Sequence, residues 1–121
     1  AQSSVHINAW KTGPHGPFDK ATMVDRVLRE RFSTSLDEAA PTLCYVGDSK
    51  NDAAMFSRAR ISVGVKNVAP HLPWLVERGQ APRYLTSGEG GLGFSEVVRA
   101  LLHARDEQAA ARYRSRGRPR W

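Results

Sequence analysis

The stretch "CYVGDSKNDAAMF", residues 44–56, decides the fold. Apolar or small residues run into Gly47, and Asp48 and Asp52 follow four residues apart. A short apolar run bounded by turn residues predicts a buried strand at 42–47, as in a parallel sheet. Open parallel sheets bind ligands beyond the carboxyl ends of their strands. The two aspartates therefore stand where a binding site is expected.

Predicted helices and strands alternate along the rest of the chain, which indicates an α/β fold with a small parallel sheet and flanking helices. Asp19 is expected to cap a helix at 20–32 whose apolar side chains share one face. The other expected elements are a strand within 3–10, a loop at 11–18, a short helix at 51–59, strands at 61–65 and 83–86, a brief helix at 69–79 and a flexible loop at 87–93. The last expected element is a helix at 94–111. Its side chains expected to point inward are Phe94, Val97, Val98, Leu101 and Leu102.

Length and charge set limits on the protein. The 121 residues make one domain at most, and no apolar run approaches the roughly 20 residues of a membrane span, so no membrane partner is expected. The net charge is +6, but residues 111–121 hold five arginines and no acid, and the remainder carries 13 basic and 12 acidic side chains. The single cysteine, Cys44, lies in the apolar run and indicates a buried thiol in the cytoplasm.

Two interpretations of the aspartates follow from the residues. Carboxylates four apart on a turn that enters a helix can converge on one point, and oxygen ligands suit Mg²⁺, which usually shares a phosphate. Ser49 and Asn51 are short hydrogen-bonding side chains that can orient a phosphate oxygen or a metal-bound water. The structural alternative makes Asp48 a helix N-cap and Asp52 a favourable charge in the first helical turn.

The string "GDSKNDAAMF" resembles motif IV of the haloacid dehalogenase (HAD) superfamily, in its Cof-type, sugar-phosphate phosphatase (IIB) branch. "FDKATMVDRVLRERF" is similar to the helix that opens with the motif III lysine, and "ISVGVKNV" and "PRYLTSGEGGLGFSEVVRALL" resemble the closing strands and the C-terminal helix. Mannosyl-3-phosphoglycerate and sucrose phosphatases have this order. The resemblance covers about residues 3–104, and Lys66 departs from the small residue typical at its position.

The resemblance implies the C-terminal half of a HAD-type Rossmann-like core, preceded by the end of an α/β cap domain. Residues 1–10 would then be the last cap strand and 11–111 the core. The run of arginines without acids predicts that 112–121 is a basic, disordered tail. The resemblance also implies a cytoplasmic Mg²⁺-dependent phosphatase that hydrolyses a sugar phosphate or a phosphoglycerate ester through an aspartyl-phosphate.

Individual residues take roles from the same resemblance. Asp48 would be a Mg²⁺ ligand, Asp52 would bind the metal or one of its waters, and Lys20 would neutralise charge on the phosphate and on the attacking carboxylate. The residues expected to contact phosphate or substrate are Ser49, Asn51 and Asn67 and, on the cap strand, His6 and Asn8. From the residues alone, Lys20 is interpreted as a solvated lysine in the first turn of a helix.

The nucleophile of the family is not in this sequence. Its mechanism needs a strand ending in Asp-x-Asp, and no two aspartates here are two residues apart. The chain by itself is therefore expected to be inactive, with an N-terminal half as its partner and an open edge on the strand at 42–47. Two alternatives remain: a non-catalytic α/β module whose arginine tail binds an anion such as RNA, and an unrelated doubly wound domain with an acidic pocket.

Overall fold

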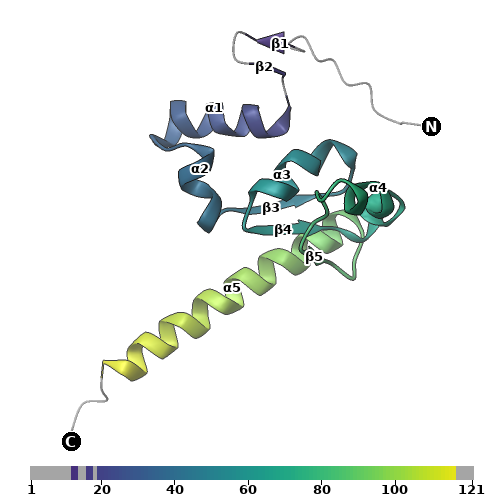
Figure 1. Cartoon of the computed structure of the whole chain (residues 1–121). Coiled ribbons are helices and arrows are strands. Elements are labelled where there is room, and N and C mark those ends of the chain that lie inside the picture. The colour runs from purple at the N-terminus through teal and green to yellow at the C-terminus, as the bar shows by residue number, and fades with distance from the viewer. Residues whose placement is uncertain (1–11, 14–15, 18, 117–121) are drawn as a thin grey trace, which may run out of the picture.

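A computed structural model describes residues 12–13, 16–17 and 19–116 and shows a mixed α/β fold (Figure 1). The strands are β1 (Thr12–Gly13), β2 (Gly16–Pro17), β3 (Cys44–Gly47), β4 (Ile61–Gly64) and β5 (Tyr84–Leu85). The helices are α1 (Lys20–Phe32), α2 (Leu36–Ala39), α3 (Ala53–Arg58), α4 (Leu72–Glu77) and α5 (Gly90–Ser115), with 3₁₀ turns η1 (Ala40–Thr42), η2 (Lys50–Asp52) and η3 (Lys66–His71).

The main sheet is parallel and has the strand order β3-β4-β5. Its register pairs Cys44 with Ile61 and Gly47 with Gly64, so the carboxyl ends of β3 and β4 lie level. In the described part of the chain β3 pairs with β4 alone, which leaves its other edge unpaired. The expected parallel sheet with flanking helices is confirmed, whereas a HAD-specific fold is not shown.

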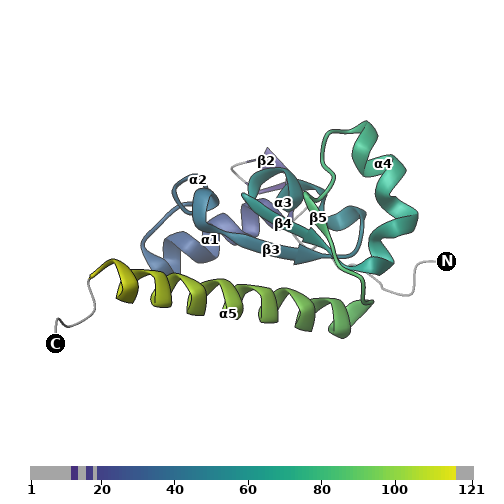
Figure 2. The same cartoon turned by 90° about the horizontal axis from the view of Figure 1, so that it is seen from below.

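Helices cover the two faces of this sheet (Figure 2). α1 packs on α2 and α3, and α3 packs on β3 and β4, whereas α5 runs along the opposite face and extends beyond the sheet (Figure 2). The crossover from β3 through α3 to β4 is the short βαβ unit that a buried parallel pair requires. The core has one buried cluster around Phe56 and Leu75 and a second around Leu36 and Met55.

The start of α1 follows from its sequence. Asp19 is extended, its side chain accepts the N–H of Thr22, and the Thr22 hydroxyl accepts the N–H of Asp19 in return. This reciprocal capping satisfies donors that a helix otherwise leaves unpaired. The prediction of a helix at 20–32 is confirmed, and it fixes Lys20 as the first helical residue.

The C-terminal helix differs from the prediction at both ends. α5 starts at Gly90, inside the expected loop, and continues to Ser115, so residues 112–115 are helical rather than a disordered tail. The segment before α5 is ordered because Glu96 accepts the backbone N–H groups of Ser87 and Gly88. These bonds fold the chain back onto the helix.

The predicted inward face of this helix is mostly wrong. Val97 is buried, whereas the other residues expected to point inward are exposed: Phe94, Val98, Leu101 and Leu102. Met23, Val27 and Phe32 on α1 are exposed in the same way. Single exposed apolar residues are ordinary, but α1 and α5 each expose several of them, and among the described residues nothing covers these side chains.

The N-terminal segment before α1 contains a short β-hairpin. The segment expected as a loop at 11–18 contains a short antiparallel pairing of β1 with β2, so the prediction of an unpaired loop was wrong there. The expected cap strand at 1–10 lies outside the described residues. Among the described residues, no helix combines the length and the apolar character needed to cross a membrane.

Candidate functional site

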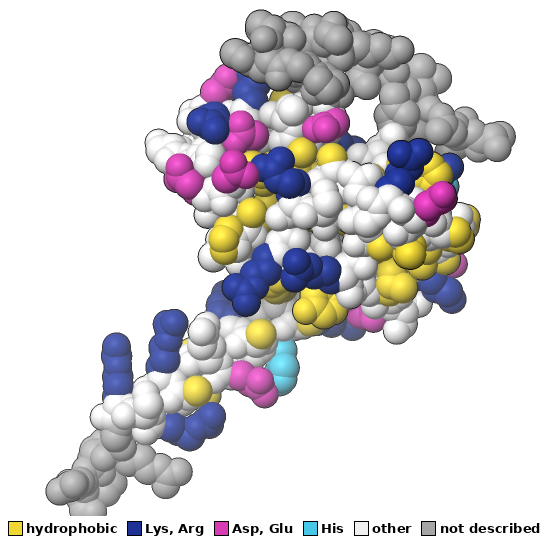
Figure 3. Space-filling model, viewed as in Figure 1, with side chains coloured by type: hydrophobic (Ala, Val, Ile, Leu, Met, Phe, Trp, Pro, Cys, Tyr) yellow, Lys and Arg dark blue, Asp and Glu magenta, His cyan; other side chains and the backbone are white. Residues whose placement is uncertain are grey.

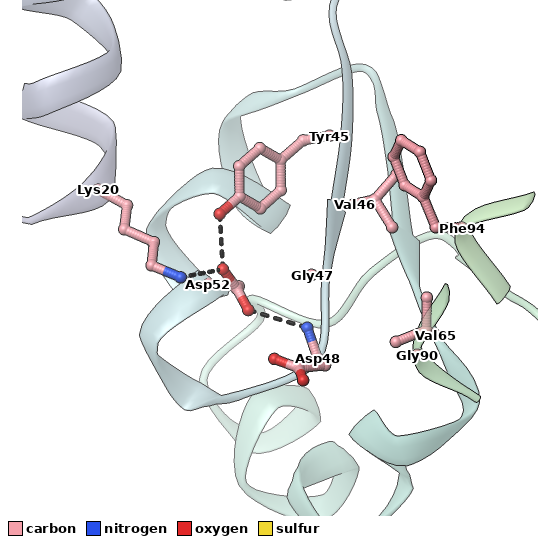
Figure 4. A pocket seen from close by; sticks show the side chains of 9 residues that line it. All are labelled: Lys20, Tyr45, Val46, Gly47, Asp48, Asp52, Val65, Gly90 and Phe94. Carbon is pink, nitrogen blue, oxygen red and sulfur yellow. Dashed lines mark hydrogen bonds and ion pairs between the residues drawn. The ribbon is translucent and has the colours of Figure 1, made fainter. Parts of the chain in front are cut away.

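A shallow pocket of ≈ 270 Å³ lies at the carboxyl end of β3, where the sequence places the two aspartates (Figure 4). Lys20 from α1, Tyr45 and Asp48 from β3 and the turn after it, and Asp52 from η2 line one side. Gly90 and Phe94 from α5 line the other. Residues from both ends of the described chain therefore meet at one edge of the sheet.

Asp52 is the most enclosed polar group of the site, with 2% of its surface exposed. Its Oδ1 accepts hydrogen bonds from Lys20 Nζ at 2.6 Å and from the Tyr45 hydroxyl at 2.5 Å (Figure 4). Its Oδ2 accepts the backbone N–H groups of Asp48 at 2.9 Å and Ser49 at 3.1 Å, and the Ser49 hydroxyl at 3.3 Å. A buried carboxylate bonded on both oxygens acts as an anchor for the loop around it.

The surroundings of Asp52 perturb two pKa values. Burial raises the pKa of the Asp52 carboxyl, but hydrogen bonds from Lys20, Tyr45 and the Asp48 N–H outweigh it, so the pKa lies below its ordinary value. Burial, together with the hydrogen bond to Asp52, raises the pKa of the Tyr45 phenol well above its ordinary value. At neutral pH Asp52 is therefore an anion and Tyr45 a neutral donor.

Gly47 is required by the position of Asp52. A Cβ atom at Gly47 would overlap the carboxyl group of Asp52, because the carboxylate packs against the backbone at the end of β3. This close approach explains why glycine precedes Asp48 in the motif.

Gly47→Ala is expected to lower the free energy of unfolding by about 1–3 kcal/mol, since the displaced carboxylate is held on both oxygens. Gly91→Ala is the matched control, because a Cβ atom there meets open space and the residue is helical. Urea unfolding of both variants would measure the difference. Equal stabilities would contradict the packing of Asp52 on Gly47.

Asp48 is exposed at the pocket and is linked to the start of α5 through Asn67. Its Oδ2 accepts a hydrogen bond from Asn67 Nδ2 at 3.0 Å, and Asn67 Oδ1 accepts the backbone N–H of Gly90 at 3.1 Å. One side chain from η3 thus fixes the orientation of the carboxylate and the position of the α5 N-terminus. The structure places Asn67 beside the site, as predicted from the resemblance.

Lys20 connects α1 to the site across 32 residues of sequence. Its side chain is half exposed, and one N–H of the ammonium is bound to Asp52. The remaining N–H groups of a lysine ammonium can bind a second anion. Lys20 is thus a lysine in the first turn of α1, as its alternative interpretation had it, but one whose ammonium is paired with Asp52.

The other predicted residues have mixed outcomes. The half-buried Ser49 donates to Asp52, so it supports the anchor, and Asn51 is exposed on η2. Ser49, rather than Asp48, occupies the N-cap position of η2, so the alternative of an Asp48 cap was wrong. His6 and Asn8 lie outside the described residues.

The site offers few side chains that could bind Mg²⁺. Among the described residues, no group of three or more His, Cys, Asp or Glu side chains gathers into a metal site. Asp48 presents an exposed carboxylate, whereas both oxygens of Asp52 are engaged within the protein. One available carboxylate fits a Mg²⁺ ion that keeps several waters and shares a phosphate.

Sequence reasoning missed two residues of the site. Tyr45 was counted only as an apolar strand residue, although its phenol oxygen in an otherwise apolar strand was a signal. Gly90 was placed in a flexible loop, and no local pattern connects it with Asn67.

Comparison of the chain with protein-family models, with curated proteins and with solved structures gave no match.

Proposed function

We propose that this chain supplies the metal- and phosphate-binding part of a cytoplasmic Mg²⁺-dependent phosphatase of the HAD kind, acting on a sugar phosphate or a phosphoglycerate ester. A second segment would supply the attacking carboxylate. The observation that carries the proposal is the meeting of Lys20 with Asp52, beside the exposed Asp48, at the carboxyl end of a parallel strand. A cation and two carboxylates at that edge are the groups that phosphoryl transfer uses for positioning and charge neutralisation.

The unpaired edge of β3 is the place for the missing nucleophile. A parallel strand added there would lie about 4.8 Å from β3, so a carboxylate at its end would come next to Asp48. The exposed apolar side chains on α1 and α5 would be covered by the same segment. The proposal therefore accounts for the open edge and for the apolar surface together.

Each residue of this chain then has a defined task. Asp48 would hold Mg²⁺, which when bound would neutralise charge on the phosphate oxygens. Lys20 would present its free N–H groups to the same phosphate, and Asp52 would hold the lysine in place. Asn67 would keep the Asp48 carboxylate turned toward the pocket.

The test joins this chain to a segment that carries an Asp-x-Asp strand, as one polypeptide or by co-expression. Phosphate release from a broad panel of phosphate esters is measured with Mg²⁺ and with EDTA. We expect release only from the combined protein and only with Mg²⁺, with this chain alone as the inactive control. No release from any ester by the combined protein would overturn the proposal.

One observation favours a second function, the binding of RNA by the C-terminal arginines. All residues from 98 to 116 are exposed, and α5 holds Arg105, Arg112 and Arg114 on an ordered helix rather than on a tail. Figure 3 shows basic side chains along the part of this helix that extends beyond the sheet. Arg105 and Arg112 are seven residues apart and share a helical face, which suits contacts to successive phosphates.

A triple variant, Arg112→Gln, Arg114→Gln and Arg116→Gln, tests this function. If RNA binds there, the salt dependence of binding to a single-stranded RNA should weaken by about 2 in the log–log slope, since each contact contributes about 0.7. The control removes the same charge at three exposed residues elsewhere, Arg31, Lys66 and Arg83. Equal slopes for both variants would exclude the helix as the RNA site.

A further inference from the structure

We propose that Tyr45 is a positioning residue that fixes Lys20 through Asp52. The Tyr45 hydroxyl and the Lys20 ammonium donate to the same atom, Asp52 Oδ1, at 2.5 and 2.6 Å. The inference deepens the proposed function, on which it rests for the use made of Lys20. It assigns a role to a residue for which the resemblance gave none.

The geometry makes the phenol a rigid support. Tyr45 lies on β3, and its side chain points to the side of the sheet from which Lys20 and Asp52 approach, whereas Val46 points to Phe94 on the other side (Figure 4). The ring packs edge-to-face on Phe56 at 6.1 Å between centroids and contacts both core clusters. A core-packed ring has little freedom, so its hydroxyl defines a fixed point for Oδ1.

The two oxygens of Asp52 are held by different parts of the chain. Backbone N–H groups after β3 hold Oδ2, which prevents translation of the carboxylate. Without the Tyr45 hydroxyl, the donor left to Oδ1 among the described residues would be Lys20, a long side chain that is half exposed. Oδ1 would then move with the flexible lysine side chain. With Tyr45 present, Oδ1 is fixed and in turn fixes the position of the Lys20 ammonium. The expected consequence is that the ammonium is held at the edge of the pocket.

The experiment is a double-mutant cycle on this chain with Tyr45→Phe, Lys20→Met and the double variant, measured by urea unfolding. We expect Lys20→Met to change the unfolding equilibrium constant less in the Tyr45→Phe background, by about threefold or more. The ammonium NMR signal of Lys20 should broaden or disappear in Tyr45→Phe. Tyr113→Phe, which removes a phenol from an exposed position on α5, is the control and should change neither.

Additive effects together with an unchanged Lys20 signal would overturn the proposal, because Tyr45 would then act by packing alone. If Tyr45→Phe does not fold, the wild-type chain decides: a slowly exchanging Tyr45 hydroxyl proton close to the Lys20 ammonium supports the proposal, and its absence overturns it. None of these measurements needs catalysis. An inactive combined protein would therefore refute the proposed phosphatase while leaving the positioning result readable.

Discussion

Asp52→Asn is expected to lower the free energy of unfolding by about 3 kcal/mol, a large share of the 5–15 kcal/mol typical of a small domain. The substitution keeps the shape of the side chain but removes the charge. The amide NH₂ group of the asparagine would replace one of the two accepting oxygens of Asp52. It would then face donors, either Lys20 and Tyr45 or the backbone N–H groups of Asp48 and Ser49. This loss of about 3 kcal/mol is at the lower end of the range for breaking a buried ion pair, because Lys20 is half exposed and screened by solvent.

Asp48→Asn is the matched control, because Asp48 is the other aspartate of the motif and is exposed. We expect its effect on the free energy of unfolding to stay within about 0.5 kcal/mol.

The difference in stability between Asp52→Asn and Asp48→Asn also depends on pH. Because the pKa of Asp52 is lowered in the folded state, its stabilisation is present above its unfolded value of about 4 and is lost as the pH falls through the folded value. A difference between the two variants that does not shrink on acidification would contradict the assigned role of Asp52.

Lys20→Met is expected to lower kcat/KM of the combined phosphatase by about 10²–10³-fold, which is the usual cost of removing one preorganised charge that stabilises the transferring phosphoryl group. Lys20 is the one described lysine of the chain with a contact to Asp52. The measurement is phosphate release at saturating Mg²⁺, made at a temperature at which the variant remains folded.

Lys50→Met is the control for this activity loss. Lys50 lies on η2 two residues before Asp52, but its ammonium lies 5.3 Å from the centre of the Trp74 ring. We expect its kcat/KM to stay within about threefold of the parent, since a surface charge that touches neither substrate nor Asp52 contributes little. Similar losses in both variants would show that Lys20 acts by general charge and not by position.

Local patterns in the sequence were sufficient for much of the fold. The helix at 20–32 could be placed from Asp19 and the apolar spacing, and the strands after 42 and 61 from compact apolar runs. The ends of α5 could not be placed in this way. Glycines 90, 91 and 93 disfavour helix locally, yet Glu96 holds the preceding loop and Gly93 fits where a side chain would overlap Thr86 and Gly88.

The sequence by itself determined which chemical groups are present and that Asp48 and Asp52 follow a parallel strand, because residue order and hydrophobic pattern are local properties. The predicted full burial of that strand was wrong, since Cys44–Gly47 are all half-buried. Only the tertiary structure decided how the two aspartates differ. Packing of α1 and of β3 on α3 brings Lys20 and Tyr45 onto Asp52 and makes it a buried anchor, while Asp48 stays exposed and is held by Asn67. These contacts join residues far apart in sequence, and burial assigns different chemistry to two identical side chains.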